Sequence, residues 1–242
     1  MKEYTERTYR KKVSAQGLET FQVAVKETDL WVSSGRTLVA ETRDLIFNFR
    51  HQIESYIQSH PDFLTALQPY PADPLAPPLV RTMIESTRVV GVGPMASVAG
   101  AIAESVGFGL LALTDQVIVE NGGDIFLKVN RPVTISVFAG NSPLSEKIGL
   151  LVSTKNMPLG VCTSSGTVGH SFSMGVADVA CVIASTAALA DGAATALGNR
   201  IHGRGDLNRI APWAGSIKGI LGCLVILGDS MAAWGDVELV EL

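Results

Sequence analysis

The sequence predicts a fold that combines β-strands with helices rich in alanine and glycine. Short apolar strands end in tight glycine turns, most clearly at residues 117–124, which read V-I-V-E-N-G-G-D. An Ala/Gly-rich helix occurs twice, once within residues 91–107 and again, directly after a strand, within residues 178–199. We interpret this recurrence as a duplicated β/α building block.

The length and composition indicate an extensive core or a large subunit interface. Of the 242 residues, 47% are apolar and 17% are charged, which excludes a disordered chain. The 24 glycines point to many close approaches of the backbone. We expect a single domain over residues 1–242, an internal duplication whose halves meet near residues 110–160, and assembly into a homo-oligomer.

The charge and hydropathy of the chain bear on its partners and its location. A net charge of −4 argues against nucleic acid as a partner. The N-terminal segment M-K-E-Y-T-E-R-T-Y-R-K-K lacks the apolar region of a secretory signal. The longest apolar run, residues 219–228, has about half the length of a membrane-spanning helix and is therefore assigned to a buried strand. We expect a cytoplasmic protein that does not enter a membrane.

The N-terminal part of the chain predicts a hairpin, a long helix and an irregular excursion. Residues 21–25 and 30–32 alternate apolar and polar side chains around a turn at residues 27–29. Residues 38–59 carry apolar side chains at helical spacing, which indicates an amphipathic helix. Residues 61–78 contain six prolines, so we expect a loop that packs on the surface.

A glycine loop precedes the first Ala-rich helix. Gly91, Gly93 and Pro94 interrupt the chain just before this helix, whose N-terminus is therefore presented behind the loop. The spacing matches neither a P-loop nor a dinucleotide fingerprint. Because Glu104 on this helix has no visible partner, we interpret it as solvated or capped rather than as a catalytic acid.

The C-terminal half predicts further strands and a second small-residue helix. The strands are expected at residues 117–119, 125–129, 133–138, 149–153 and 178–185, and the helix at residues 186–199. A polar loop follows with His202, Arg204 and Asp206. We expect residues 219–227 and 237–242 to close the sheet around a turn at residues 228–230.

Residues 159–173 concentrate glycines and hydroxyl side chains beyond what a turn requires. The candidate ligand contacts in this segment are Thr163, Ser164, Ser165 and Gly166. A polar cluster between apolar segments is typical of a binding site. His170 is the histidine best placed to act as an acid, a base or a ligand contact, and an imidazole satisfied by a neighbouring hydroxyl is the alternative.

Two further segments could complete such a site. Gly122, Gly123 and Asp124 form either an ordinary hairpin turn or a backbone surface for an anionic ligand. Asp191 and Thr195 lie one helical turn apart, so their oxygen atoms face the same way and suit a hard metal ion. The alternative for Asp191 is an ordinary role in capping its helix.

These three segments, taken together, resemble the ApbE family, the FAD:protein FMN transferases. N-G-G-D at residues 121–124 is similar to the G-G-D of that family. C-T-S-S-G at residues 162–166 stands where its T-S-G lies, and His170 follows where the family has a histidine. A-D-x-x-x-T at residues 190–195 is similar to the family motif whose Asp and Thr bind Mg²⁺.

The resemblance implies an α+β fold with duplicated T-fold-type halves, in which mixed or antiparallel sheets pack on the Ala/Gly-rich helices. It also implies a nucleotide ligand, FAD or FMN, held by glycine-rich backbone, with Mg²⁺ bound by Asp191 and Thr195. The implied reaction breaks the P–O–P link of FAD and passes FMN to a hydroxyl of an acceptor protein, leaving AMP. Asp124 would hydrogen-bond a hydroxyl or position a base, and His170 would act as acid or base.

The chain departs from the family pattern in two places. Residues 93–97 read G-P-M-A-S without the lysine of the family, and its H-x-x-D-P segment is reduced to G-H-S-F-S at residues 169–173. A second hypothesis is therefore a non-catalytic protein that binds a flavin, a purine or a pterin-like ring. A third, a hydrolase using Cys162 or Ser165 with His170, ranks last because the sequence forms no nucleophile elbow.

Overall fold

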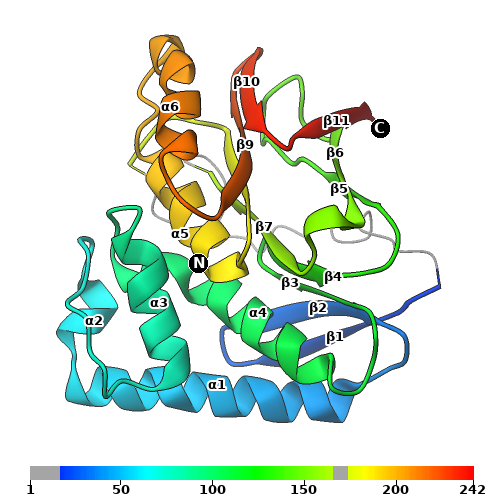
Figure 1. The fold of residues 1–242 in the computed structure, drawn as a ribbon, viewed down its shortest axis with the longest axis vertical. Coiled ribbons are helices and arrows are strands. Elements are labelled where there is room, and N and C mark those ends of the chain that lie inside the picture. Colours follow the sequence, from blue (N-terminus) through cyan, green and yellow to red (C-terminus); the bar gives the residue numbers. More distant parts are fainter. Residues whose placement is uncertain (1–16, 166–173) are drawn as a thin grey trace.

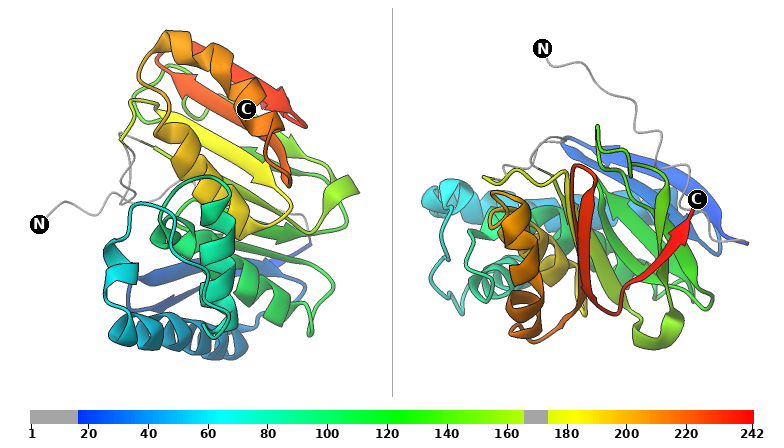
Figure 2. Two further views of the ribbon diagram at one scale, coloured as in Figure 1. Left: turned by 60° about the vertical axis from the view of Figure 1, so that its left-hand side comes forward. Right: turned by 90° about the horizontal axis from the view of Figure 1, so that it is seen from above.

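The structure, a computed structural model, describes residues 17–165 and 174–242 (Figure 1). A layer of helices covers one face of an eight-stranded sheet, and a three-stranded sheet packs on the opposite face (Figure 2). All strand pairs in these two ranges are antiparallel. The predicted α+β class with antiparallel sheets is confirmed.

The larger sheet has the strand order β1-β2-β3-β4-β7-β8-β9-β10. Its strands are β1 (Glu19–Val25), β2 (Thr28–Ser34), β3 (Val117–Asn121), β4 (Asp124–Lys128), β7 (Leu159–Ser164), β8 (Val179–Ala184), β9 (Ile220–Leu227) and β10 (Ser230–Gly235). The smaller sheet has the order β11-β6-β5. Its strands are β5 (Val133–Ser136), β6 (Ile148–Val152) and β11 (Glu238–Glu241).

Six α-helices are seen in the described ranges. They are α1 (Val39–Ser59), α2 (Asp62–Thr65), α3 (Pro78–Arg88), α4 (Val98–Leu110), α5 (Ala187–Gly198) and α6 (Ile210–Gly215). Short 3₁₀ turns form η2 (Pro94–Ser97), η3 (Thr154–Asn156) and η4 (Arg204–Arg209). The opening hairpin, the long α1 helix and the two Ala/Gly-rich helices lie where the sequence predicted them.

The two halves of the larger sheet repeat one order of elements. Each half contains a hairpin, one or more helices and a second hairpin: β1-β2, α1 to α4, β3-β4 in the first half, and β7-β8, α5 and α6, β9-β10 in the second. In each half, the second strand of the first hairpin pairs with the first strand of the second hairpin, as β2 with β3 and β8 with β9. The halves join where β4 pairs with β7.

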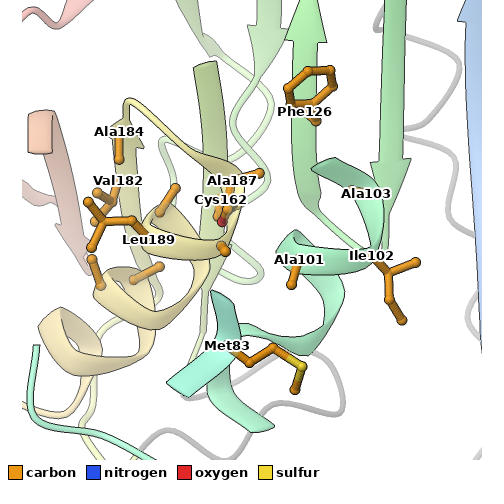
Figure 3. Packing of buried hydrophobic residues seen from close by; sticks show 14 of the residues in the cluster. Met83, Ala101, Ile102, Ala103, Phe126, Cys162, Val182, Ala184, Ala187 and Leu189 are labelled. Carbon is orange, nitrogen blue, oxygen red and sulfur yellow. Dashed lines mark hydrogen bonds between the residues drawn. The ribbon is translucent and has the colours of Figure 1, made fainter. Parts of the chain in front are cut away.

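Successive side chains of the larger sheet point to opposite faces and contribute to two separate apolar cores. Phe126 of β4 belongs to the core under the helices, whereas its neighbours Ile125 and Leu127 belong to the core under the smaller sheet. On the helical side, Ala187 of α5 lies next to Cys162 of β7, whose thiol donates to the Ala187 carbonyl oxygen at 3.4 Å (Figure 3). Small residues let these helices approach the sheet closely.

The C-terminal end of the chain differs from the prediction. The turn at residues 228–230 leads into β10, a strand that the sequence analysis missed because its residues, S-M-A-A-W-G, carry little β-strand signal. The final strand does not close the larger sheet, because β11 pairs with β6 instead. Gly235, at a φ of 77°, ends β10 in a left-handed conformation before the chain turns towards the smaller sheet.

Two loop predictions also need correction. Asp62–Thr65 forms one helical turn within the proline-rich segment that was expected to be irregular. The predicted polar loop containing Arg204 and Asp206 is largely the 3₁₀ turn η4. Nothing helical in the described ranges is both long and apolar enough to cross a membrane.

Candidate functional site

Three of the motifs singled out in the sequence meet between the larger sheet and the helix layer. β3 ends at Asn121 opposite Asp124, which begins β4, and β7 runs antiparallel beside β4. The Nδ2 of Asn121 donates to the carbonyl oxygen of Ala99 at the start of α4, at 3.1 Å. The charge of Asp191 on α5 acts on the Asp124 carboxyl. The strand ends, the N-terminus of α4 and the first half of α5 therefore surround one site.

Gly122 and Gly123 form a tight hairpin turn at this site. Their φ angles are 71° and 110°, a left-handed conformation that glycine adopts without strain. The Gly123 N–H donates to Glu120 Oε1 at 2.7 Å, and the Thr163 hydroxyl donates to the Gly123 carbonyl oxygen at 3.2 Å. These two bonds fix the turn directly before Asp124.

Asp124 is a buried acid with one unsatisfied oxygen. Only 7% of the residue is exposed, and its Oδ1 has no hydrogen-bond partner among the described residues. Burial raises the pKa of this carboxyl well above its ordinary value, and the charge of Asp191 raises it further. The Cys162 thiol and the Thr163 N–H oppose this rise but do not cancel it. Such a carboxyl is suited to exchange a proton or to meet a cation.

Asp191 caps the neighbouring helix. Its Oδ2 accepts the Gly100 N–H in the first turn of α4 at 2.8 Å. Burial raises the Asp191 pKa to about 7, and the N–H groups of Gly100 and Ala99 act against the rise. The alternative, a helix-capping role, is therefore correct in kind, but the capped helix is α4. The N-cap of α5 is Thr186, whose hydroxyl accepts the Leu189 N–H at 3.2 Å.

Glu104 makes the reciprocal contact from α4. Its Oε2 accepts the Ala188 N–H in the first turn of α5 at 3.0 Å. Burial raises the Glu104 pKa, and the N–H groups of Ala188 and Ala187 oppose that rise. Of the two interpretations offered together for Glu104, this contact supports the capping role, and the residue is also partly exposed. Its partner could not be seen in the sequence, because it belongs to a helix 84 positions further along the chain.

The remaining candidate residues divide into three groups. Ser164 is buried with 3% exposure, and its Oγ has no hydrogen-bond partner within the described ranges. Thr195 is partly buried one turn after Asp191 on α5, and Ser165 is partly buried just beyond β7. Gly166 and His170 lie outside the described residues.

The next question is whether the described side chains could bind a hard cation such as Mg²⁺. Residues 17–165 and 174–242 contain no group of three or more His, Cys, Asp or Glu side chains that could hold a metal ion by itself. The interacting carboxylates of Asp124 and Asp191 nevertheless share a desolvated region, where a bound cation would offset their repulsion. Two carboxylates are fewer oxygen ligands than a divalent ion requires, so Thr195, backbone or a substrate would have to complete the set.

Cys162 does not have the surroundings of a nucleophile. The residue is fully buried at 0% exposure, and its thiol donates to the Ala187 carbonyl oxygen. Burial, followed by the charges of Asp124 and Asp191, raises the Cys162 pKa well above its ordinary value. A reactive cysteine needs a lowered pKa and access to substrate. Cys162 has neither, which argues against the hydrolase hypothesis with Cys162 as the nucleophile.

This fold is that of the solved ApbE proteins, which superpose on the chain over most of its length. The apo flavinyl transferase ApbE of Pseudomonas stutzeri superposes with a TM-score of 0.56 at 14% identity, over 90% of this chain and 94% of that chain. The ApbE protein of Thermotoga maritima superposes with a TM-score of 0.55 at 12% identity, over 88% and 96% of the two chains.

The family described as "AbpE bacteria" matches residues 10–212, and the chain belongs to this family. Among its relatives, the UPF0280 protein of Methanococcus aeolicus is 41% identical over 204 residues, which cover 81% of each chain. The UPF0280 protein of Methanosarcina acetivorans is 37% identical over 240 residues, which cover 98% of this chain and 94% of the relative. The predicted resemblance to the ApbE family is confirmed.

Proposed function

We propose that the protein is a Mg²⁺-dependent flavin-nucleotide enzyme that transfers FMN from FAD to a hydroxyl group of an acceptor protein. The observation that carries the proposal is the buried Asp124 carboxyl, whose Oδ1 lacks a hydrogen-bond partner among the described residues, beside Asp191. Support comes from the fold, because solved proteins with this architecture are named flavin transferases.

In this proposal the described residues divide the work. Asp191 and Thr195 would hold Mg²⁺, and the bound ion would offset negative charge on the phosphoryl oxygens. The acceptor hydroxyl oxygen forms a new bond to the phosphorus of the FMN half. The bond from that phosphorus to the bridging oxygen breaks, and AMP leaves with the bridging oxygen. Asp124 accepts the proton of that hydroxyl, since its raised pKa makes the carboxylate a stronger base. His170 is a second candidate acid or base.

A second candidate function is non-catalytic binding of a flavin, a purine or a pterin-like ring. One observation favours it: the Asp191 carboxylate is already satisfied by N–H groups of α4, which leaves it less available to a metal ion. The segment at residues 93–97 also lacks the lysine of the family pattern. This candidate predicts tight ligand binding without a product and with little dependence on metal.

The test is incubation of purified protein with FAD, with and without Mg²⁺, followed by separation of AMP and FMN and by a thermal-shift measurement. The variants are Asp191→Asn and Asp124→Asn, which remove charge with little change of shape. Asp44→Asn is the matched control, because Asp44 lies on the exposed side of α1. We expect Mg²⁺-dependent AMP release from the wild type and the control, reduced by about 10²-fold or more in the site variants.

The outcomes separate the two candidates. Stabilisation by FAD without AMP release would contradict the transferase and support the binding protein. AMP release that persists in both site variants would refute the assignment of the site. If FAD neither stabilises the protein nor yields AMP, both candidates are wrong.

The setting of this activity is part of the proposal. The acceptor is a protein with an accessible hydroxyl group, and we expect the reaction to take place in the cytoplasm. We also expect a homo-oligomer, on the basis of the high apolar content of the chain. Light scattering on the purified protein tests the oligomer.

A further inference from the structure

A pocket lies away from the carboxylates, lined by residues at the C-terminal end of α5 and just after it, in η4 and in α6. Its volume is about 290 Å³, near the lower end of the range for small-molecule sites. Leu197, Arg200, Arg209 and Trp213 are among its lining residues. None of the residues assigned to the flavin site lines it, so an inference from this pocket does not rest on the proposed function.

Arg200 is the distinctive group of this pocket. Its guanidinium lies over the ring of Trp213, 4.9 Å from the ring centre, and its Nη1 donates to the Ala196 carbonyl oxygen at 2.7 Å. In the described ranges no carboxylate forms an ion pair with Arg200. Arg200 is exposed as a residue, but partial loss of hydration around its guanidinium lowers its pKa. The fork of the guanidinium is thus fixed in position and retains donors for an anion.

The other walls restrict the kind of anion. Leu197, Ile201 and Ile210 are nearly fully buried and give the pocket an apolar floor. The acidic lining residue, Asp206, uses its Oδ2 to accept the N–H groups of His202 at 2.9 Å and Gly203 at 3.1 Å. An apolar floor favours a ring over a fully hydrated ion such as phosphate.

Arg209 adds a second cation at the rim. Its side chain is 84% exposed and stands 3.8 Å from Asp206, a weak surface pair. Arg209 can turn towards an incoming anion at little cost in free energy, because it gives up only this weak pair. The pocket therefore combines a fixed cation, a mobile cation and an apolar floor.

We propose that this pocket binds a small aromatic carboxylate. The carboxylate pairs with the guanidinium of Arg200, and the ring lies on Leu197, Ile201 and Ile210. A volume of about 290 Å³ admits one substituted ring and excludes a whole dinucleotide.

Benzoate is the probe, and benzamide, which has the same shape without the charge, is its control. In NMR spectra of the full-length protein, the indole N–H signal of Trp213, assigned with Trp213→Phe, should shift and saturate with benzoate. Benzamide and inorganic phosphate should bind at least roughly tenfold more weakly. Benzamide lacks the negative charge that pairs with Arg200, and phosphate lacks the ring that packs on the apolar residues. Equal shifts with benzoate and benzamide, or no saturable shift with benzoate, would overturn the proposal. The wild-type protein is sufficient for this measurement.

Variants then locate the site. Arg200→Gln should weaken benzoate binding by roughly tenfold or more, since the charged hydrogen bonds are lost. Arg88→Gln, at an exposed position on α3, is the matched control and should bind as the wild type does. If Arg200→Gln folds and binds benzoate unchanged, the pocket is not the site. If it does not fold, Arg209→Gln at the exposed rim should still weaken binding by roughly twofold to threefold, and unchanged binding there would contradict the role given to the rim cation.

Discussion

Asp191 and Glu104 each cap the helix that carries the other. Asp191 on α5 accepts the N–H of Gly100 at the start of α4, and Glu104 on α4 accepts the N–H of Ala188 at the start of α5. Each carboxylate thereby satisfies a backbone donor that its neighbour's first turn leaves free. The two hydrogen bonds join the first turns of α4 and α5 to the facing helix, and the one from Gly100 fixes the position of the Asp191 carboxylate.

Removing the Glu104 carboxylate should loosen α5 without touching the candidate site directly. Glu104→Ala leaves the Ala188 N–H without its acceptor, so we expect the free energy of unfolding to fall by about 1–2 kcal/mol. Glu104→Gln keeps an oxygen acceptor and should recover most of that loss. Urea unfolding followed by circular dichroism measures both, and Glu85→Ala on the exposed side of α3 is the control. Equal stability of the Ala and Gln variants would show that the cap contributes nothing.

The contact between the helices also depends on a missing side chain. A Cβ added at Gly100 would overlap the carbonyl oxygen of Ala187 and lie 2.8 Å from the Cβ of Asp191. Because the obstacle is backbone, we expect Gly100→Ala to destabilise the protein by about 1–3 kcal/mol. Gly205→Ala, where the added Cβ meets nothing within 4 Å, should leave the urea midpoint nearly unchanged. A Gly100→Ala midpoint equal to that of the control would contradict the close crossing of α4 and α5.

The sequence was sufficient for features that depend on local pattern. The helical period of α1, the hairpin signal at Gly122 and Gly123, and the alternation in β1 each follow from neighbouring residues, and each was predicted correctly. β10 was missed because Ala232 and Ala233 give little strand preference, and it forms by pairing with β9.

The contacts within the candidate site were harder to predict from the sequence. The motifs containing Asp124 and Asp191 were recognised, but their electrostatic interaction depends on the placement of α5 over β4 and β7, which no local period encodes. The same holds for Glu104, whose acceptor role requires the N-terminus of α5 beside it. Sequence reasoning therefore found the residues and missed which of them act on each other.

The buried carboxyls predict how stability depends on pH. Burial raises the Asp191 pKa from 3.8 to about 7, and it raises the Asp124 pKa as well. The folded protein therefore holds more protons than the unfolded chain between about pH 4 and 7, so the free energy of unfolding should fall as the pH rises through this window. The fall should be on the order of 2–4 kcal/mol.

Asp124→Asn isolates the part of this dependence that comes from the acidic pair. The substitution removes one desolvated charge and its repulsion of Asp191, so the variant should be more stable than the wild type at pH 8 and should show a shallower slope. Thermal unfolding at pH 5, 6, 7 and 8 measures the slope, with Asp44→Asn as the exposed control. A wild-type stability that rises between pH 5 and 8, with Asp124→Asn following the same line, would contradict the raised pKa values.

The stabilisation of the protein by Mg²⁺ should depend on the charge of the same two carboxyl groups. At pH 8 Asp191, whose pKa is raised to about 7, is largely ionised and can attract a cation, whereas at pH 5 it is protonated and offers little charge. We expect millimolar Mg²⁺ to raise the melting temperature by about 2–4 °C at pH 8, equivalent to about 1 kcal/mol, and by much less at pH 5. Asp191→Asn should abolish the difference between the two pH values, and Asp44→Asn should retain it. A Mg²⁺ effect of equal size at pH 5 and 8, unchanged in Asp191→Asn, would place the cation elsewhere, because only groups that lose a proton between these pH values can gain affinity for a metal ion across them.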